Sequence, residues 1–215
     1  MNIRRILAYT TRHLYLYKRS LPRLMEIFYW PLLDLLVWGF ISLYLARYGG
    51  KGLLPDFVAF FVGALILWDI LFRCQQGLSI SFLEDMWSRN LLNVFVSPFT
   101  PVEYVCSLLV ISSIKLALAS TVLVTLALML YSFNIFVLGF PLIPLVCNLI
   151  IMGWSIGIIT TAVILRYGQE AEVLAWGIAF LFQPVSCVFY PVEILPPVLQ
   201  TIAWFVPASH VFEGM

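Results

Sequence analysis

The stretch that decides the fold runs from Ser81 to Tyr104 and reads SFLEDMWSRNLLNVFVSPFTPVEY. It is the longest polar interruption between the long apolar runs of the chain. Ser81 and Glu84 have the spacing of a capping box, in which two side chains satisfy free backbone N–H groups at a helix start. Pro98 ends the helix, because proline lacks an N–H donor and clashes with the preceding turn. We therefore expect a short polar helix over 81–97.

The predicted helix over 81–97 is amphipathic on a helical wheel. Its apolar side chains share one face, and most of its charged and polar side chains cover the other. A short amphipathic helix between two membrane-length segments is expected to lie along the membrane surface. One apolar side chain, Leu92, lies on the polar face, which indicates contact with a protein partner. The alternative is a surface helix that only connects two membrane spans.

The composition of the chain places it in a lipid bilayer. Of its 215 residues, 62% are hydrophobic and 11% are charged, and the mean hydropathy is +1.00. A soluble domain carries about 25% charged residues, so this chain cannot cover a water-facing surface with polar groups. The net charge of +1 excludes a general affinity for nucleic acid. The four cysteines are widely separated, so neither a metal site nor a disulfide framework is predicted.

Five apolar segments are long enough to cross a hydrocarbon core of roughly 30 Å. They are residues 27–46, 57–80, 102–131, 141–165 and 173–192. The chain is therefore predicted to be all-α, a polytopic transmembrane helical protein with a single membrane domain over 1–215.

Two further segments flank these spans. The basic, amphipathic segment 1–23 is predicted to form an interfacial helix whose cations meet lipid headgroups. The apolar segment 193–210 contains three prolines, so a full helical crossing is not expected there. Non-helical backbone at membrane depth must be shielded by protein or line a cavity. We therefore expect an extracellular re-entrant segment at 193–210.

Positive charge is unevenly divided between the two sides of this topology. One side holds the N-terminus, the 81–97 segment and these basic residues: Arg4, Arg5, Arg12, Lys18, Arg19, Arg23, Arg73, Arg89 and Arg166. The loops of the other side hold Arg47 and Lys51. Because Lys and Arg are enriched in cytoplasmic loops, we expect a multi-pass protein of the inner (cytoplasmic) membrane with a cytoplasmic N-terminus.

Two local patterns resemble one family of membrane proteins. FLEDMWSRNLLNVFVSPFTPVEY, residues 82–104, resembles the connector between spans two and three of ABC-2 type transporter permeases. FYPVEILPPVLQTIAWFVPASHVFEGM, residues 189–215, resembles the segment between spans five and six of the same family. The basic interfacial helix before the first span agrees with both. The family normally has six spans, so the resemblance implies a further span after Met215.

The resemblance implies partners and a transport function. Such permeases pair with a second permease copy or paralogue, and an ATP-binding ABC subunit grips a cytoplasmic coupling helix, here 81–97. The complex exports polysaccharides, lipids, drugs or similar cargo. ATP and Mg²⁺ belong to the partner subunit, and no cofactor is expected on this chain. The sequence contains no GxxxxGK[ST] phosphate loop, so we expect a transport subunit without its own ATPase site rather than an enzyme.

The residues expected to face the ATP-binding subunit lie on the polar face of the predicted coupling helix: Glu84, Asp85, Ser88, Arg89 and Leu92. No catalytic residues and no metal ligands are predicted.

Among the charged residues of the predicted spans, three are candidates for an intramembrane site: Asp34, Asp69 and Lys115. An ionisable group near the centre of a membrane helix costs about 2.5–3.5 kcal/mol on insertion scales, so it needs a partner or a function. One interpretation is an intramembrane polar site that lines a substrate path. A second possibility for the same site is a proton relay, in which case the chain would be an ion-coupled secondary transporter. The other interpretation is a buried interhelical ion pair. A non-transporting membrane scaffold is a third hypothesis for the whole chain.

Overall fold

The computed structural model describes residues 1–48 and 54–215, with the side chains of 26, 27, 46 and 54–56 left out. The described part is built of helices, without a strand. The longer helices are α1 (Ile3–Arg19), α2 (Leu21–Tyr48), α3 (Leu54–Trp87), α5 (Pro101–Tyr131) and α6 (Leu142–Tyr167). The shorter ones are α4 (Leu91–Val96), η1 (Ile135–Leu138), η2 (Gly168–Glu172), α7 (Val173–Phe182), η3 (Val192–Ile194), α8 (Pro197–Phe205) and α9 (Pro207–Glu213). The predicted all-α polytopic membrane fold is confirmed.

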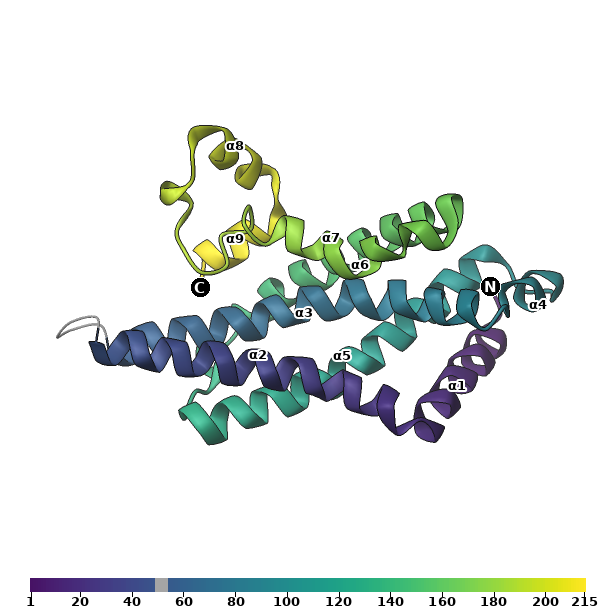
Figure 1. Ribbon diagram of the computed structural model, residues 1–215, viewed down its shortest axis with the longest axis horizontal. Helices are drawn as coiled ribbons and strands as arrows, with labels where there is room; N and C mark the ends of the chain where they lie inside the picture. The colour runs from purple at the N-terminus through teal and green to yellow at the C-terminus, as the bar shows by residue number, and fades with distance from the viewer. Residues whose placement is uncertain (49–53) are drawn as a thin grey trace.

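Helix α3 is the central helix of the molecule. It packs against α2, α5, α6 and α7, and most of its membrane-length portion is buried by them (Figure 1). Helix α2 is the least buried of the long helices. Helices α1 and α4 and the start of α5 lie at one end of the bundle, at the right of Figure 1. We call this the α4 end of the molecule.

Small residues allow α3 to approach its neighbours closely. A Cβ atom added to Gly153 of α6 would lie 2.5 Å from the carbonyl oxygen of Leu71 and 2.7 Å from Cβ of Cys74. A Cβ atom added to Gly157, one turn later, would lie 3.1 Å from the carbonyl oxygen of Gln75. Glycines at these two positions therefore permit close packing of α6 against α3.

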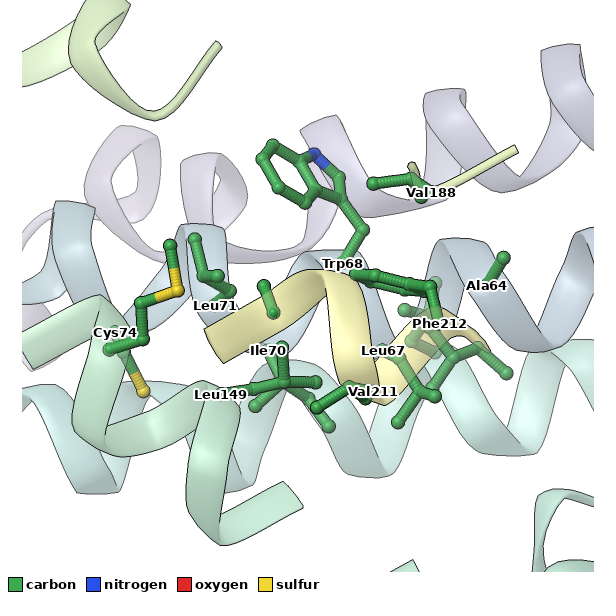
Figure 2. Packing of buried hydrophobic residues seen from close by; sticks show 14 of the residues in the cluster. Ala64, Leu67, Trp68, Ile70, Leu71, Cys74, Leu149, Val188, Val211 and Phe212 are labelled. Atoms are coloured by element: carbon green, nitrogen blue, oxygen red, sulfur yellow. The ribbon is translucent and has the colours of Figure 1, made fainter. Parts of the chain in front are cut away.

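The main core lies between α3, α6 and the end of the chain. Leu67 and Trp68 of α3, Leu149 of α6, and Val211 and Phe212 of α9 are buried in one cluster (Figure 2). The predicted re-entrant segment at 193–210 therefore forms two short helices, α8 and α9, of which α9 packs into the core. Pro207 begins α9, a position where its missing N–H costs nothing.

The membrane-length helices differ from the expected spans in one respect. Among the described residues, four helical stretches are long and apolar enough to cross a membrane, and the fourth, Leu142–Phe182, contains both α6 and α7. Helix α7 ends at Phe182, ten residues before the expected end of a fifth span at Val192. Pro184 lies two residues further on, and proline has no N–H to donate a further helical hydrogen bond.

The predicted start of the coupling helix at Ser81 is wrong. Helix α3 continues without a break through Ser81 to Trp87, and the Ser81 hydroxyl donates to the carbonyl of Gly77 inside that helix. The preceding residues 74–80 are helical, and 74–79 are buried, so nothing ends the helix before Ser81. The capping box of this region instead joins Thr100 and Glu103 at the start of α5. The segment 81–97 thus consists of the end of α3, a turn, and α4.

Candidate functional site

Helix α1 lies against the α4 end of the molecule rather than apart from it. Asn2 caps its first turn, and its side chain accepts a hydrogen bond from the N–H of Arg4. Its buried stripe includes Tyr9, His13 and Tyr17, which lie at helical spacing and face α3 and α5. Because this stripe is polar and aromatic, it contacts charged groups of the protein rather than lipid tails.

Asp85 is the main acceptor for this stripe. Its carboxylate accepts hydrogen bonds from the hydroxyl of Tyr9 and from the hydroxyl of Tyr104 of α5, the latter at 3.2 Å. Arg12 of α1 pairs with it at 3.0 Å. Asp85 is buried to 1% exposure, where an uncompensated charge would be costly, so these three partners hold α1 and α5 to the end of α3.

Glu84 makes a second set of contacts to the same helix. Its carboxylate accepts a hydrogen bond from the hydroxyl of Tyr17 at 2.8 Å, and Nε of Arg23, at the start of α2, lies 3.9 Å from its Oε1. His13 lies between the two carboxylates, 3.7 Å from Glu84 Oε2 and 3.5 Å from Asp85 Oδ2, and it is fully buried. Burial lowers the pKa of His13 below its ordinary value, although the Glu84 carboxylate acts in the opposite direction.

The two ends of this arrangement are joined by Glu103. It completes the capping box with Thr100, and its carboxylate also accepts a hydrogen bond from the backbone N–H of Asn2 at 2.7 Å. Arg5 lies 3.5 Å from it and also donates to the carbonyl of Pro98. The start of α1, the loop after α4 and the start of α5 are therefore one connected unit.

The residues predicted to face a partner fall into two groups. Glu84 and Asp85 are buried against α1, so the structure places them inside the chain, where α1 covers them. Ser88, Arg89 and Leu92 are exposed, and Leu92 is 77% exposed.

The exposed tip of the α4 end consists of the turn at 88–90 and the outer face of α4. Val96 is 86% exposed on α4, so an apolar strip runs along the short helix next to the polar turn. Arg89 has a φ of 52°, the left-handed region, which lets the chain reverse between α3 and α4. Beside α4 lies a groove of about 350 Å³. Its lining comes from α1, including Arg5 and Arg12, and from the loop after α4, including Phe99.

The three intramembrane charges lie in different surroundings. Lys115 Nζ donates to Ser81 Oγ at 2.8 Å and lies 4.4 Å from the ring centre of Tyr17. Asp69 pairs with Arg73 at 3.1 Å within α3. Asp34 of α2 is exposed and lines a small hollow together with Asp69.

Sequence reasoning missed several of these groups, and some had a signal. Thr100 and Glu103 have the capping-box spacing directly before an apolar run, a pattern visible in the sequence. Arg73 follows Asp69 by four residues, the spacing of a helical ion pair. The role of Tyr9 could not be predicted, because only the fold brings it to Asp85.

A further contact joins η2, the short helix after α6, to the α4 end of the molecule. Trp87 Nε1, at the end of α3, donates to Glu172 Oε2 of η2 at 3.1 Å. The N-terminus, the tip at 88–96 and the loop after α6 therefore share one end of the molecule (Figure 1).

Comparison with known proteins gives one result. The family model described as ABC-2 type transporter matches residues 5–215, which is nearly the whole chain. No curated protein matches the chain.

Proposed function

This chain belongs to the ABC-2 type transporter family, and from that premise we propose that it is the permease subunit of an exporter driven by a separate ATP-binding subunit. The proposed binding surface for that subunit is the exposed tip of the α4 end: Ser88, Arg89 and Leu92 with the outer face of α4. The observation that carries the proposal is the exposed apolar strip of α4, formed by Leu92 and Val96. This strip follows directly after α3, the most buried of the membrane-length helices. Exposed apolar residues of this kind mark protein contacts.

The proposed mechanism is mechanical. Closure of two ATP-binding subunits around ATP and Mg²⁺ displaces the tip, and α3 carries the displacement into the core because it continues unbroken from Trp87 into the bundle. Asp85 and Glu84 transmit the same movement to α1, since they join α1 to α3 through charged and hydroxyl groups. The movement opens a path between two permease copies or a permease and its paralogue.

The proposed location is the cytoplasmic membrane, with the α4 end in the cytoplasm. The support for this orientation is that the predicted inner loops and the basic helix α1 gather at that end. Basic residues near membrane helices favour the cytoplasmic side.

The test is copurification from native membranes. An affinity-tagged chain is expected to bring down a subunit with a phosphate-loop motif and ATPase activity. Leu92→Asp is expected to reduce its recovery about tenfold or more, because a charge in an apolar contact costs about 2 kcal/mol or more at a hot spot. Val137→Asp is the control, because Val137 of η1 is 85% exposed and lies in the loop after the far end of α5.

Three results would contradict the proposal. One is the absence of any ATPase subunit from preparations that still contain folded chain. The second is equal loss of the subunit in Leu92→Asp and Val137→Asp. The third is uptake by the purified chain alone that follows an ion gradient, which would favour a secondary transporter instead.

A further inference from the structure

A cavity lined mainly by aromatic rings lies between α2, α3 and α7, away from the tip. Its volume is about 330 Å³, within the range of about 300–1,000 Å³ that small-molecule sites occupy. Its walls include four tryptophans and one carboxylate: Trp30, Trp38, Trp68, Trp176 and Asp34.

Several of the aromatic rings on the walls contact one another. Trp38 of α2 stacks on Phe189 with ring centres 5.6 Å apart and planes inclined by 20°. Phe72 of α3 and Phe180 of α7 meet at 5.1 Å on the lining of the same cavity. The faces of aromatic rings carry negative electrostatic potential and attract cations, most strongly at tryptophan.

The charge next to these rings is negative. Asp34 lines both this cavity and the small adjoining hollow, where Asp69 is the second carboxylate. Asp69 is buried to 8% exposure, and Arg73 contacts its Oδ1, while its Oδ2 has no hydrogen-bond partner in the described part of the chain. When both carboxylates are ionised, their charge exceeds that of the single guanidinium by one at the edge of the cavity.

We propose that this cavity binds a hydrophobic organic monocation, an ammonium or phosphonium with aromatic or alkyl substituents, as cargo of the transporter. The proposal rests on the proposed permease function for its cargo role. The rings supply apolar contact and cation–π attraction, and Asp34 supplies the counter-charge. A carboxylate at membrane depth is costly by itself, and a bound cation offsets that cost.

The chemistry of the walls favours a cation over other cargo. An anion would be repelled by Asp34 and by the faces of the tryptophan rings. A sugar needs many hydrogen-bond partners, both donors and acceptors, and apart from the indole N–H donors of the tryptophans the uncharged polar groups on the lining are the two amides of Gln76 and Gln183. The cavity is therefore matched in shape and charge to an apolar cation.

The experiment measures equilibrium binding of radiolabelled tetraphenylphosphonium to the purified full-length chain in detergent, without ATP or a partner subunit. Tetraphenylborate, an anion of the same shape, is the comparison probe. We expect saturable binding of the cation and none of the anion. Asp34→Asn is expected to weaken cation binding about tenfold or more, because it removes the charge but keeps the shape. Trp38→Leu is expected to weaken it about threefold or more.

Matched controls separate the site from general effects on the protein. Asp34→Glu retains the charge and is expected to retain binding within about threefold of the wild type. Glu193→Gln removes an exposed carboxylate outside the cavity, and Trp204→Leu removes an exposed tryptophan of α8, so both are expected to bind as the wild type does. Size-exclusion chromatography verifies that each variant is folded.

The proposal is overturned if Asp34→Asn binds the cation as tightly as the wild type, if tetraphenylborate binds equally well, or if an oligosaccharide displaces the cation from the wild-type chain. Because the measurement uses the chain alone, failure of cation binding leaves the permease function standing. Failure of ATPase capture in the test of that function would leave the cavity a cation site but remove its role in ATP-driven export.

Discussion

His13 shows how a single residue reports the docking of α1. It is fully buried between Glu84 and Asp85, with Lys115 and Arg12 acting on it as further charges. The neighbouring hydroxyls of Tyr9 and Tyr17 are bound to the same two carboxylates. Since burial lowers the pKa of His13, the imidazole is neutral in the folded protein at neutral pH. A neutral ring fits the apolar part of this contact, whereas protonation adds a charge that burial disfavours.

Acidification is therefore expected to destabilise the contact between α1 and α3. The folded-state pKa of His13 lies below the unfolded value of about 6.5, so the unfolded state binds more protons and stability falls as the pH drops below about 6.5. Burial raises the pKa of Asp85 to about 6, so protonation of Asp85 acts in the opposite direction in the same pH range. Between pH 7.5 and pH 5.5 the thermal midpoint in detergent should therefore fall more in the wild type than in His13→Gln, which keeps Asp85 but does not titrate at position 13. An equal decrease in both proteins would contradict the role given to His13.

At the scale of elements, the decisive features are one very close helix contact and one reversal of the chain. Gly153 lets α6 touch the backbone of α3, so the two helices pack with no side chain between them at that point. Arg89 lets α3 turn into α4 through a left-handed conformation. Both features use backbone geometry, and both can be tested with paired substitutions.

Gly153→Val is expected to reduce the free energy of unfolding by about 1–3 kcal/mol, because the added atoms overlap Leu71 and Cys74 and force α3 and α6 apart. Gly177→Val in α7 is the matched control, since no atom lies within 4 Å of a Cβ placed there. The measurement is thermal or denaturant unfolding in detergent. Equal effects of the two substitutions would show that the α3–α6 contact is looser than described.

Arg89→Gly is expected to preserve the turn and remove the side chain from the tip, whereas Arg89→Val strains the backbone by about 1–3 kcal/mol. The glycine variant should therefore unfold at the same temperature as the wild type and the valine variant at a lower one. If ATPase recovery falls in the glycine variant, the guanidinium itself contacts the partner. A glycine variant less stable than the valine variant would rule out the left-handed turn.

The sequence predicts the helices well and their ends less well. Apolar length alone locates α2, α3, α5 and α6, because a helix that crosses a bilayer must be long and apolar. The capping box was misplaced at Ser81, since local spacing cannot show that α3 continues through it.

The candidate site was predicted in part. The exposed residues Arg89 and Leu92 follow from the polar stretch. The burial of Glu84 and Asp85 does not, because it depends on α1, which is about 70 residues distant in sequence and reaches them only in the fold. Contacts between elements so far apart along the chain leave no periodic signal.

At the scale of the whole molecule, the chain has two distinct ends. The tip, α1 and η2 share one end, whereas η1 follows the far end of α5 (Figure 1). The expected outer loop residue Lys51 lies outside the described residues. The basic residues of α1 concentrate positive charge at one end of the molecule, and such charge favours the cytoplasmic side of a membrane.

The orientation is testable by cysteine labelling. In a variant without the four native cysteines, Val137→Cys should react with a membrane-impermeant maleimide in intact cells, because η1 is expected outside. Ser88→Cys should react only after the cells are opened, because the tip is expected in the cytoplasm. Both positions are exposed in the chain itself, so lack of reaction in intact cells does not report burial within the permease. The reverse pattern would invert the proposed topology.

The unbroken length of α3 has a mechanical consequence. Its 34 residues extend about 51 Å at 1.5 Å per residue, and no proline interrupts it after its first turn. A rod without a joint tilts as one body, so a rotation of about 5° at one terminus moves the other by about 4 Å. A movement of α3 at one face of the membrane is therefore accompanied by a movement of its other end at the opposite face.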